Sequence, residues 1–148
     1  MQTIDATEIR HQHQQLAATL EAVHEVLACI ESDGRLTRPA TAGWLLLQSL
    51  RDRLADHFAL EEDGGYFAQA SAEAPHLTRG IEELQLDHRD LSTRAEQLAD
   101  LAVAARDDAP LWKRAREDFD QLRQLLLDHE QREDDLIFQL HQVDLGGG

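Results

Sequence analysis

The sequence predicts an all-α fold, an antiparallel up-down-up-down four-helix bundle. Apolar residues recur at alternating steps of three and four residues in four long stretches, which places them on one face of each helix. The connections between these stretches are short, and the 148 residues include only three prolines. We therefore expect one domain over residues 1–142, followed by a flexible tail at 143–148.

The first helix is expected over residues 9–30, with Asp5 as its N-cap and the turn at 32–34 as its end. The second is expected to follow Pro39 and to reach Glu61. In both stretches the inward-facing apolar positions, here called the seam, are mostly leucine, isoleucine or valine. These are the side chains that a bundle core requires.

A Gly64-Gly65 pair follows the second stretch. It either ends that helix or interrupts a helix that continues to about Ala70. Two further connections and two further helices complete the chain: a connection at 71–75, a helix over 77–105, a turn at 107–110 with a cap and a first-turn proline, and a helix over 112–140.

Composition narrows the classes of function. A formal charge of −15 argues against nucleic acid or an anionic membrane as a partner. The chain has no run of ~18 apolar residues and no basic-then-apolar N-terminal signal, so a cytoplasmic location is expected. The single cysteine, Cys29, excludes an internal disulfide, and we expect it to be a small buried residue rather than a reactive thiol.

Six polar residues interrupt the seams, and the other seam positions are apolar. The remaining histidines fall off the seams. An ionised carboxylate in a dry core is costly unless it is paired or bound to a cation. The six are His13, His57, Glu61, His88, His129 and Glu133.

These residues are predicted to lie at one height in the bundle. Residues that face each other across a hairpin are equally far from its turn. His13 and His57 are symmetric about residue 35, in the first turn, and His88 and His129 are symmetric about the turn at 107–110. The two halves also repeat one pattern, a lone histidine followed by His-x-x-x-Glu.

Four imidazoles and two carboxylates that meet in an apolar core form a metal site of nitrogen and oxygen ligands. The two carboxylates, from opposite helices, are placed to bridge two cations ~3.5–4 Å apart. Iron is the first choice, and manganese or zinc are less favoured. The alternative is structural: hydrogen-bonded core histidines and two buried ion pairs.

With these residues the chain resembles the hemerythrin-like, or HHE cation-binding, family. The phrases DHFALEEDGGYF (56–67) and DHEQREDDLIFQL (128–140) carry the likeness. The resemblance implies two iron ions with an oxo or hydroxo bridge, and binding or sensing of O₂ or NO. Oxygen carriers of the family have a fifth histidine one turn from His88, where this chain has Leu84 and Ser92. They also use an aspartate five residues after the last histidine. Asp134 occupies that spacing here, whereas the seam position favours Glu133 as the ligand.

The expected function is therefore a non-haem di-iron protein that binds or senses O₂ or NO at a carboxylate-bridged centre. The alternative is a di-iron redox enzyme or an iron donor or storage protein, which would act in peroxide or NO turnover, iron-sulfur cluster repair or iron homeostasis. Glu62, Tyr66 and His76 lie toward the same end of the bundle and are candidates for its entrance, although surface or packing roles are favoured for Tyr66 and His76. The acidic residues over 130–135 are expected to form mostly a solvated face. The sequence indicates no protein partner.

Overall fold

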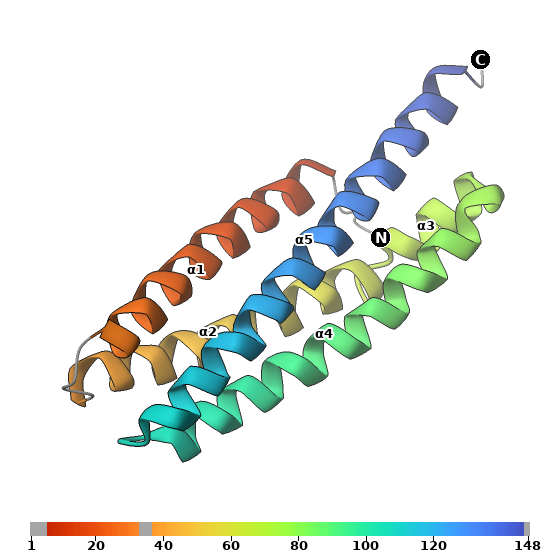
Figure 1. The fold of residues 1–148 in the computed structure, drawn as a ribbon. Coiled ribbons are helices and arrows are strands. Elements are labelled where there is room, and N and C mark those ends of the chain that lie inside the picture. The colour runs from red at the N-terminus through yellow and green to blue at the C-terminus, as the bar shows by residue number, and fades with distance from the viewer. Residues whose placement is uncertain (1–5, 33–36, 147–148) are drawn as a thin grey trace.

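The computed structural model describes residues 6–32 and 37–146, which form four long helices and two short ones (Figure 1). The elements, in chain order, are α1 (Ala6–Ser32), α2 (Thr37–Glu62), α3 (Tyr66–Glu73), the 3-10 turn η1 (Pro75–Leu77), α4 (Thr78–Ala105) and α5 (Ala109–Gly146). No strand occurs in the described ranges. The predicted all-α class is confirmed.

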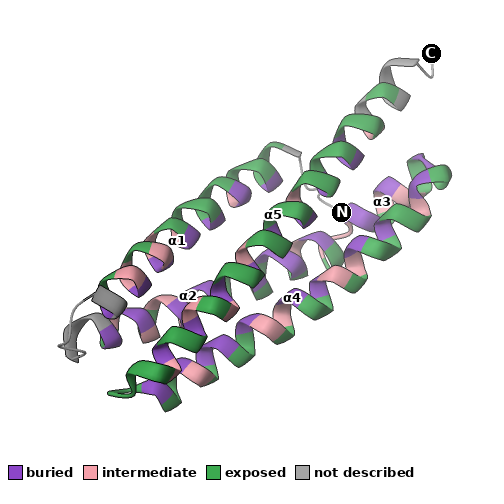
Figure 2. Ribbon diagram, viewed as in Figure 1, coloured by how far each residue is buried: buried purple, intermediate pink, exposed green. Residues whose placement is uncertain are grey.

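Each long helix packs against two others. α1 contacts α2 and α5, and α4 contacts the same two helices (Figure 1). The four therefore surround one core, and each turns a buried stripe toward it while its outer face stays exposed (Figure 2). The short α3 packs against α2 and α4 near the end of the bundle where α2 finishes.

The core has two apolar clusters with a polar layer between them. The larger cluster draws on all four long helices and includes Leu20, Leu50, Leu98 and Phe119. The smaller one is built around α3 and includes Phe67. On α1, α4 and α5 the polar seam residues lie in sequence between the residues that the helix gives to the two clusters, whereas α2 contributes only to the larger cluster and its Glu61 follows that part.

Gly43 is needed for the close approach of helices in the larger cluster. A Cβ atom at this position would lie 2.9 Å from Cδ1 of Ile30 and 3.2 Å from Cζ3 of Trp112. The missing side chain lets α2 approach both α1 and the indole of α5. This contact closes the bundle at the end away from α3.

The Gly64-Gly65 pair does end the second helix. α2 stops at Glu62, and Gly65 adopts a left-handed conformation with φ of 87° before α3 begins at Tyr66. The predicted connection at 71–75 is wrong at its start, because α3 continues to Glu73 to bury Phe67 and Ala70. The connection is Ala74 and the 3-10 turn.

Asp108 caps α5 as predicted, since its carboxylate accepts the N–H of Leu111 at 3.2 Å. The helix runs to Gly146, beyond the predicted boundary at 142, because no glycine or proline interrupts it earlier. Residues 147–148 of the predicted tail, the cap Asp5 and most of the turn at 32–34 lie outside the described residues.

Two remaining observations concern the surface. The expectation that Cys29 is buried is wrong, because it lies on the outer face between the inward-facing Leu27 and Ile30. Among the described helices, none combines the length and the apolar character needed to cross a bilayer.

Candidate metal centre

The structure brings together the six polar residues that interrupt the seams. His13 is 9% exposed, and the other five are at most 3% exposed. Of the histidines placed off the seams, His11 and His76 are exposed and His24 is half-buried, while the side chain of His141 lies outside the described ones. The predicted seam phase therefore agrees with the burial of every described histidine.

The six side chains fall into two groups of three. His13, His57 and Glu133 form position one, and Glu61, His88 and His129 form position two. Within each group, one ligand-type atom from each residue lies within 4.8 Å of the others. Each position thus offers two imidazole nitrogens and one carboxylate oxygen, a donor set suited to iron, manganese or zinc.

Each glutamate lies between the two positions. Oε1 of Glu61 is 2.8 Å from Nε2 of His57 and 3.6 Å from Nε2 of His88. Oε2 of Glu133 is 3.4 Å from the Nε2 atoms of both His13 and His129. Because each carboxylate approaches one histidine of each group, both are placed as bridges.

The buried nitrogen and oxygen atoms of this layer that could bind a metal lack hydrogen-bond partners. They include both carboxylate oxygens of Glu61 and of Glu133 and the Nε2 atom of every histidine. Nε2 of His57 and Oε1 of Glu61 are 2.8 Å apart, but they do not meet as a hydrogen bond. Leaving so many polar atoms buried and unpaired costs about 1–3 kcal/mol each. Cations bound at positions one and two would supply the missing partners, so the residues present fit a pair of metal ions.

The other ring nitrogen of each histidine faces outward to a polar side chain. Nδ1 of His57 donates to Oε1 of Gln12. Nδ1 of His129 donates to Oδ2 of Asp87 at 3.0 Å, and Asp87 also pairs with Arg132. Such bonds place the proton on Nδ1 and leave the Nε2 lone pair for a metal.

The two remaining histidines have more distant carboxylate partners. Nδ1 of His13 lies 3.7 Å from Asp134, and Nδ1 of His88 lies 3.4 Å from Glu62. Both distances are longer than an ordinary N–H···O hydrogen bond. Asp134 is 52% exposed whereas Glu133 is fully buried, so the seam argument placed the right acid in the core.

Aromatic rings cover position two. Phe58 stacks on His88 with centroids 3.9 Å apart, and Phe67 of α3 stacks on the same imidazole at 5.5 Å. Burial is the main cause that lowers the pKa of His88 to about 3, with His129 and His57 adding to it. Burial also lowers the pKa of His129, although its hydrogen bond to Asp87 opposes the shift. Both rings are neutral at pH 7, the form that binds metal.

Two of the candidates for the entrance, Tyr66 and His76, lie outside the polar layer. Tyr66 is buried in the smaller apolar cluster, and burial raises its pKa to about 12. His76 is exposed and lines a separate groove between α4 and α5.

The expectation of a mostly solvated acidic face holds for Asp134 and Asp135, which are exposed, and is wrong for Glu130. Glu133 is fully buried, as its seam position predicted, and Glu130 is half-buried with an unpartnered Oε1. Burial raises the pKa of Glu130, while His13 and His57 act in the opposite direction. Because His13 of α1 and His57 of α2 both act on this pKa, the carboxyl of Glu130 lies near these two helices.

Comparison with known proteins agrees with this geometry. Residues 79–148 match a family model described as the hemerythrin HHE cation binding domain. The resemblance to the hemerythrin-like family is confirmed. The matched stretch contains nearly all of α4 and all of α5, and with them His88, His129 and Glu133. Searches of curated proteins and of solved structures gave no match.

The structure also adds three residues around the polar layer that seam spacing did not predict. Gln12 and Asp87 each precede a seam histidine, and each supports a histidine on another helix. Phe58 follows a seam histidine and covers position two. The signal for all three is adjacency to a seam histidine, since such residues lie beside the neighbouring helix in a bundle.

Proposed function

We propose that this chain is a cytoplasmic non-haem di-iron protein that binds or senses O₂ or NO. Its six ligands would be His13, His57, Glu61, His88, His129 and Glu133, with both glutamates bridging. The first half of the chain would complete, in an antiparallel up-down-up-down bundle, the domain that the family model matches over 79–148.

The observation that carries the proposal is the set of buried, unpartnered donor atoms that converge in two groups of three. A purely structural layer of ion pairs would leave fewer donors unsatisfied, because unpaired buried polar groups are strongly disfavoured. Three protein groups per position, with bridging carboxylates shared, leave room for a small exogenous ligand. The family match supports cation binding in general.

Each part of the layer has a role in this function. Two iron ions would supply open coordination positions and redox chemistry for a diatomic ligand. The outward hydrogen bonds from His57 and His129 hold these rings in the tautomer that presents Nε2 to a metal. Phe58 and Phe67 exclude water beside His88. The two buried glutamates bring the negative charge that balances divalent or trivalent cations.

Elemental analysis of the purified protein tests the proposal first. We expect two iron atoms per chain and near-ultraviolet charge-transfer bands typical of a bridged pair. Glu61→Ala and Glu133→Ala should each lose the two-metal centre, since each removes a bridge. Retention of two metals with an unchanged spectrum in either variant would show that these carboxylates do not bridge.

The spectrum under oxygen or NO separates the proposed function from its alternatives. A stable, reversible change on adding either gas would support binding or sensing. Rapid loss of peroxide that disappears in His57→Ala would support a redox enzyme instead. Zinc, or one metal per chain, would move the protein away from diatomic chemistry, and no metal after anaerobic iron loading would exclude the proposal.

A further inference from the structure

The two metal positions are related by the internal repeat, and the relation extends beyond the ligands. Gln12, the residue before His13, accepts a hydrogen bond from His57. In the same way Asp87, the residue before His88, accepts one from His129. The residue after each bridging glutamate faces the lone histidine of the other half: Glu62 faces His88, and Asp134 faces His13. Wherever two residues at equivalent places of the repeat differ, the difference therefore shows how position one differs from position two.

The first difference is the charge of the supporting group. Position one has the neutral amide of Gln12 behind His57, whereas position two has the carboxylate of Asp87 behind His129. A carboxylate makes an imidazole a more basic ligand, and loss of such a partner typically costs about 10–100-fold in metal affinity. Arg132 pairs with Asp87 and offsets part of its charge, but it also fixes the carboxylate in place.

The second difference is what covers each position. Phe58 directly follows His57 and stacks on His88 of position two. Its repeat partner is Glu130, which directly follows His129, and burial leaves the Oε1 atom of Glu130 without a hydrogen-bond partner. Position two is thus sealed by an aromatic ring, and the equivalent place near position one holds a carboxylate.

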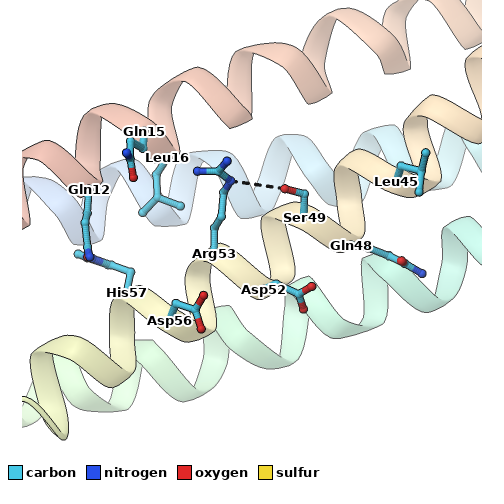
Figure 3. Close-up of a pocket in the computed structure, with 10 residues that line it drawn as sticks. All are labelled: Gln12, Gln15, Leu16, Leu45, Gln48, Ser49, Asp52, Arg53, Asp56 and His57. Atoms are coloured by element: carbon cyan, nitrogen blue, oxygen red, sulfur yellow. Dashed lines mark hydrogen bonds between the residues drawn. The ribbon is translucent and has the colours of Figure 1, made fainter.

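The third difference is access from solvent. An open groove of about 560 Å³ between α1 and α2 ends at Gln12 and His57 (Figure 3). Gln12 extends from α1 to the His57 ring and forms the end wall of the groove (Figure 3). The side chain of His13, also of position one, is 10% exposed, whereas those of His57, His88 and His129 are 3%, 3% and 1% exposed.

From these three differences we infer that position one is the exchangeable metal position, which releases its metal fast, and that position two releases its metal slowly. Gln12 and Asp87 are the positioning residues that set the difference. The inference rests on the proposed two-metal centre and adds which of its two positions exchanges its metal faster.

Metal release tests this inference without measuring any activity. The probe is Fe²⁺: protein loaded anaerobically with two irons per chain is mixed with excess iron chelator, and the coloured complex is followed with time. We expect two phases of one iron each. His57→Ala should retain only the slow phase, which assigns the fast phase to position one.

Two isosteric substitutions then exchange the supporting groups. Gln12→Glu should slow the fast phase about tenfold, and Asp87→Asn should accelerate the slow phase about tenfold, because each changes the charge behind one histidine. Gln14→Glu is the matched control, since it adds the same charge to the exposed face of α1. It should leave both phases unchanged.

The outcomes separate this inference from the proposed function. Failure of the wild-type protein to hold two irons would refute both. Two irons released in one phase, or a Gln12→Glu variant in which only the slow phase changes, would refute the inference and leave the di-iron centre intact. If Asp87→Asn does not fold, Gln12→Glu alone still decides, because the side chains have the same shape and size.

Discussion

The two apolar clusters of the core differ in how they are built and in what they protect. The larger one follows regular three-four spacing on all four long helices and contains residues such as Leu50 and Phe119 that are at most 1% exposed. The smaller one depends on α3, which exists because Gly64 and Gly65 end α2 and let Phe67 fold back over His88. Fold stability thus resides mainly in the larger cluster, and the smaller one helps to shield the polar layer, together with Phe58 of the larger cluster.

The largest expected effect comes from the larger cluster. Phe119→Ala should lower the free energy of unfolding by about 3–5 kcal/mol, because it leaves a cavity among fully buried neighbours. Phe138→Ala is the matched control on the same helix, since Phe138 is 62% exposed. It should change the free energy by less than about 0.5 kcal/mol. Urea unfolding measures both, and equal effects would contradict the division of the core.

Removing a carboxylate from the polar layer should change the stability of the metal-free protein and that of the iron-loaded protein in opposite directions. Glu133→Leu removes two buried oxygens that lack partners, so the metal-free protein should gain about 1–3 kcal/mol. With Fe²⁺ present the same variant should be less stable than wild type, because it loses a bridge and the stabilisation that metal binding provides. Thermal unfolding with and without Fe²⁺ reports both signs. Destabilisation in both states would indicate a structural ion pair.

The pH dependence of the metal-free protein follows from His88. Its folded pKa of about 3 lies below the unfolded value of 6.5, so the unfolded chain binds more protons between these values. Stability is therefore complete above pH 6.5 and falls as the pH drops through this window, by up to about 1.4 kcal/mol per pH unit for one histidine. His88→Leu should flatten the dependence. An unchanged slope would mean that His88 is protonated in the fold.

The sequence predicted the buried polar layer well because one physical rule decides it. Burial follows seam phase, so a histidine or glutamate on the seam has to enter the core, as His129 and Glu133 do. Cys29 shows the limit of that rule, since an apolar neighbourhood in sequence was mistaken for an inward direction. Cys29 is two residues after Leu27, and on a helix that spacing places it on the outer face.

The groups around the ligands were harder to predict, because off-seam positions are ambiguous. Gln12 and Glu130 both sit beside a seam histidine, and side chains there turn either to the next helix or to water. The choice depends on which helix lies alongside, and that follows from packing rather than from spacing. The hydrogen bond from His57 to Gln12 and the half-burial of Glu130 required the three-dimensional arrangement.

Chelation of the metal should produce a local effect that follows the same division. Hydrogen exchange of backbone amides in α3 should accelerate severalfold on iron removal, because α3 is short and packs over His88. Amides around Leu98 and Phe119 should keep their protection, since the larger cluster does not need the metal. Equal acceleration in both regions would mean that the whole bundle depends on iron.

The smallest expected effect is that of His24→Ala. His24 belongs to α1, as does His13, but it lies off the seam and is half-buried beside the larger cluster rather than in the polar layer. The variant should keep two irons per chain and change the free energy of unfolding by less than about 0.5 kcal/mol. His13→Ala, compared in parallel by elemental analysis, should lose iron from position one. Loss of iron in His24→Ala would mean that the metal meets a different face of α1 from the one that carries His13. The division between a structural core and a ligand layer would then no longer hold.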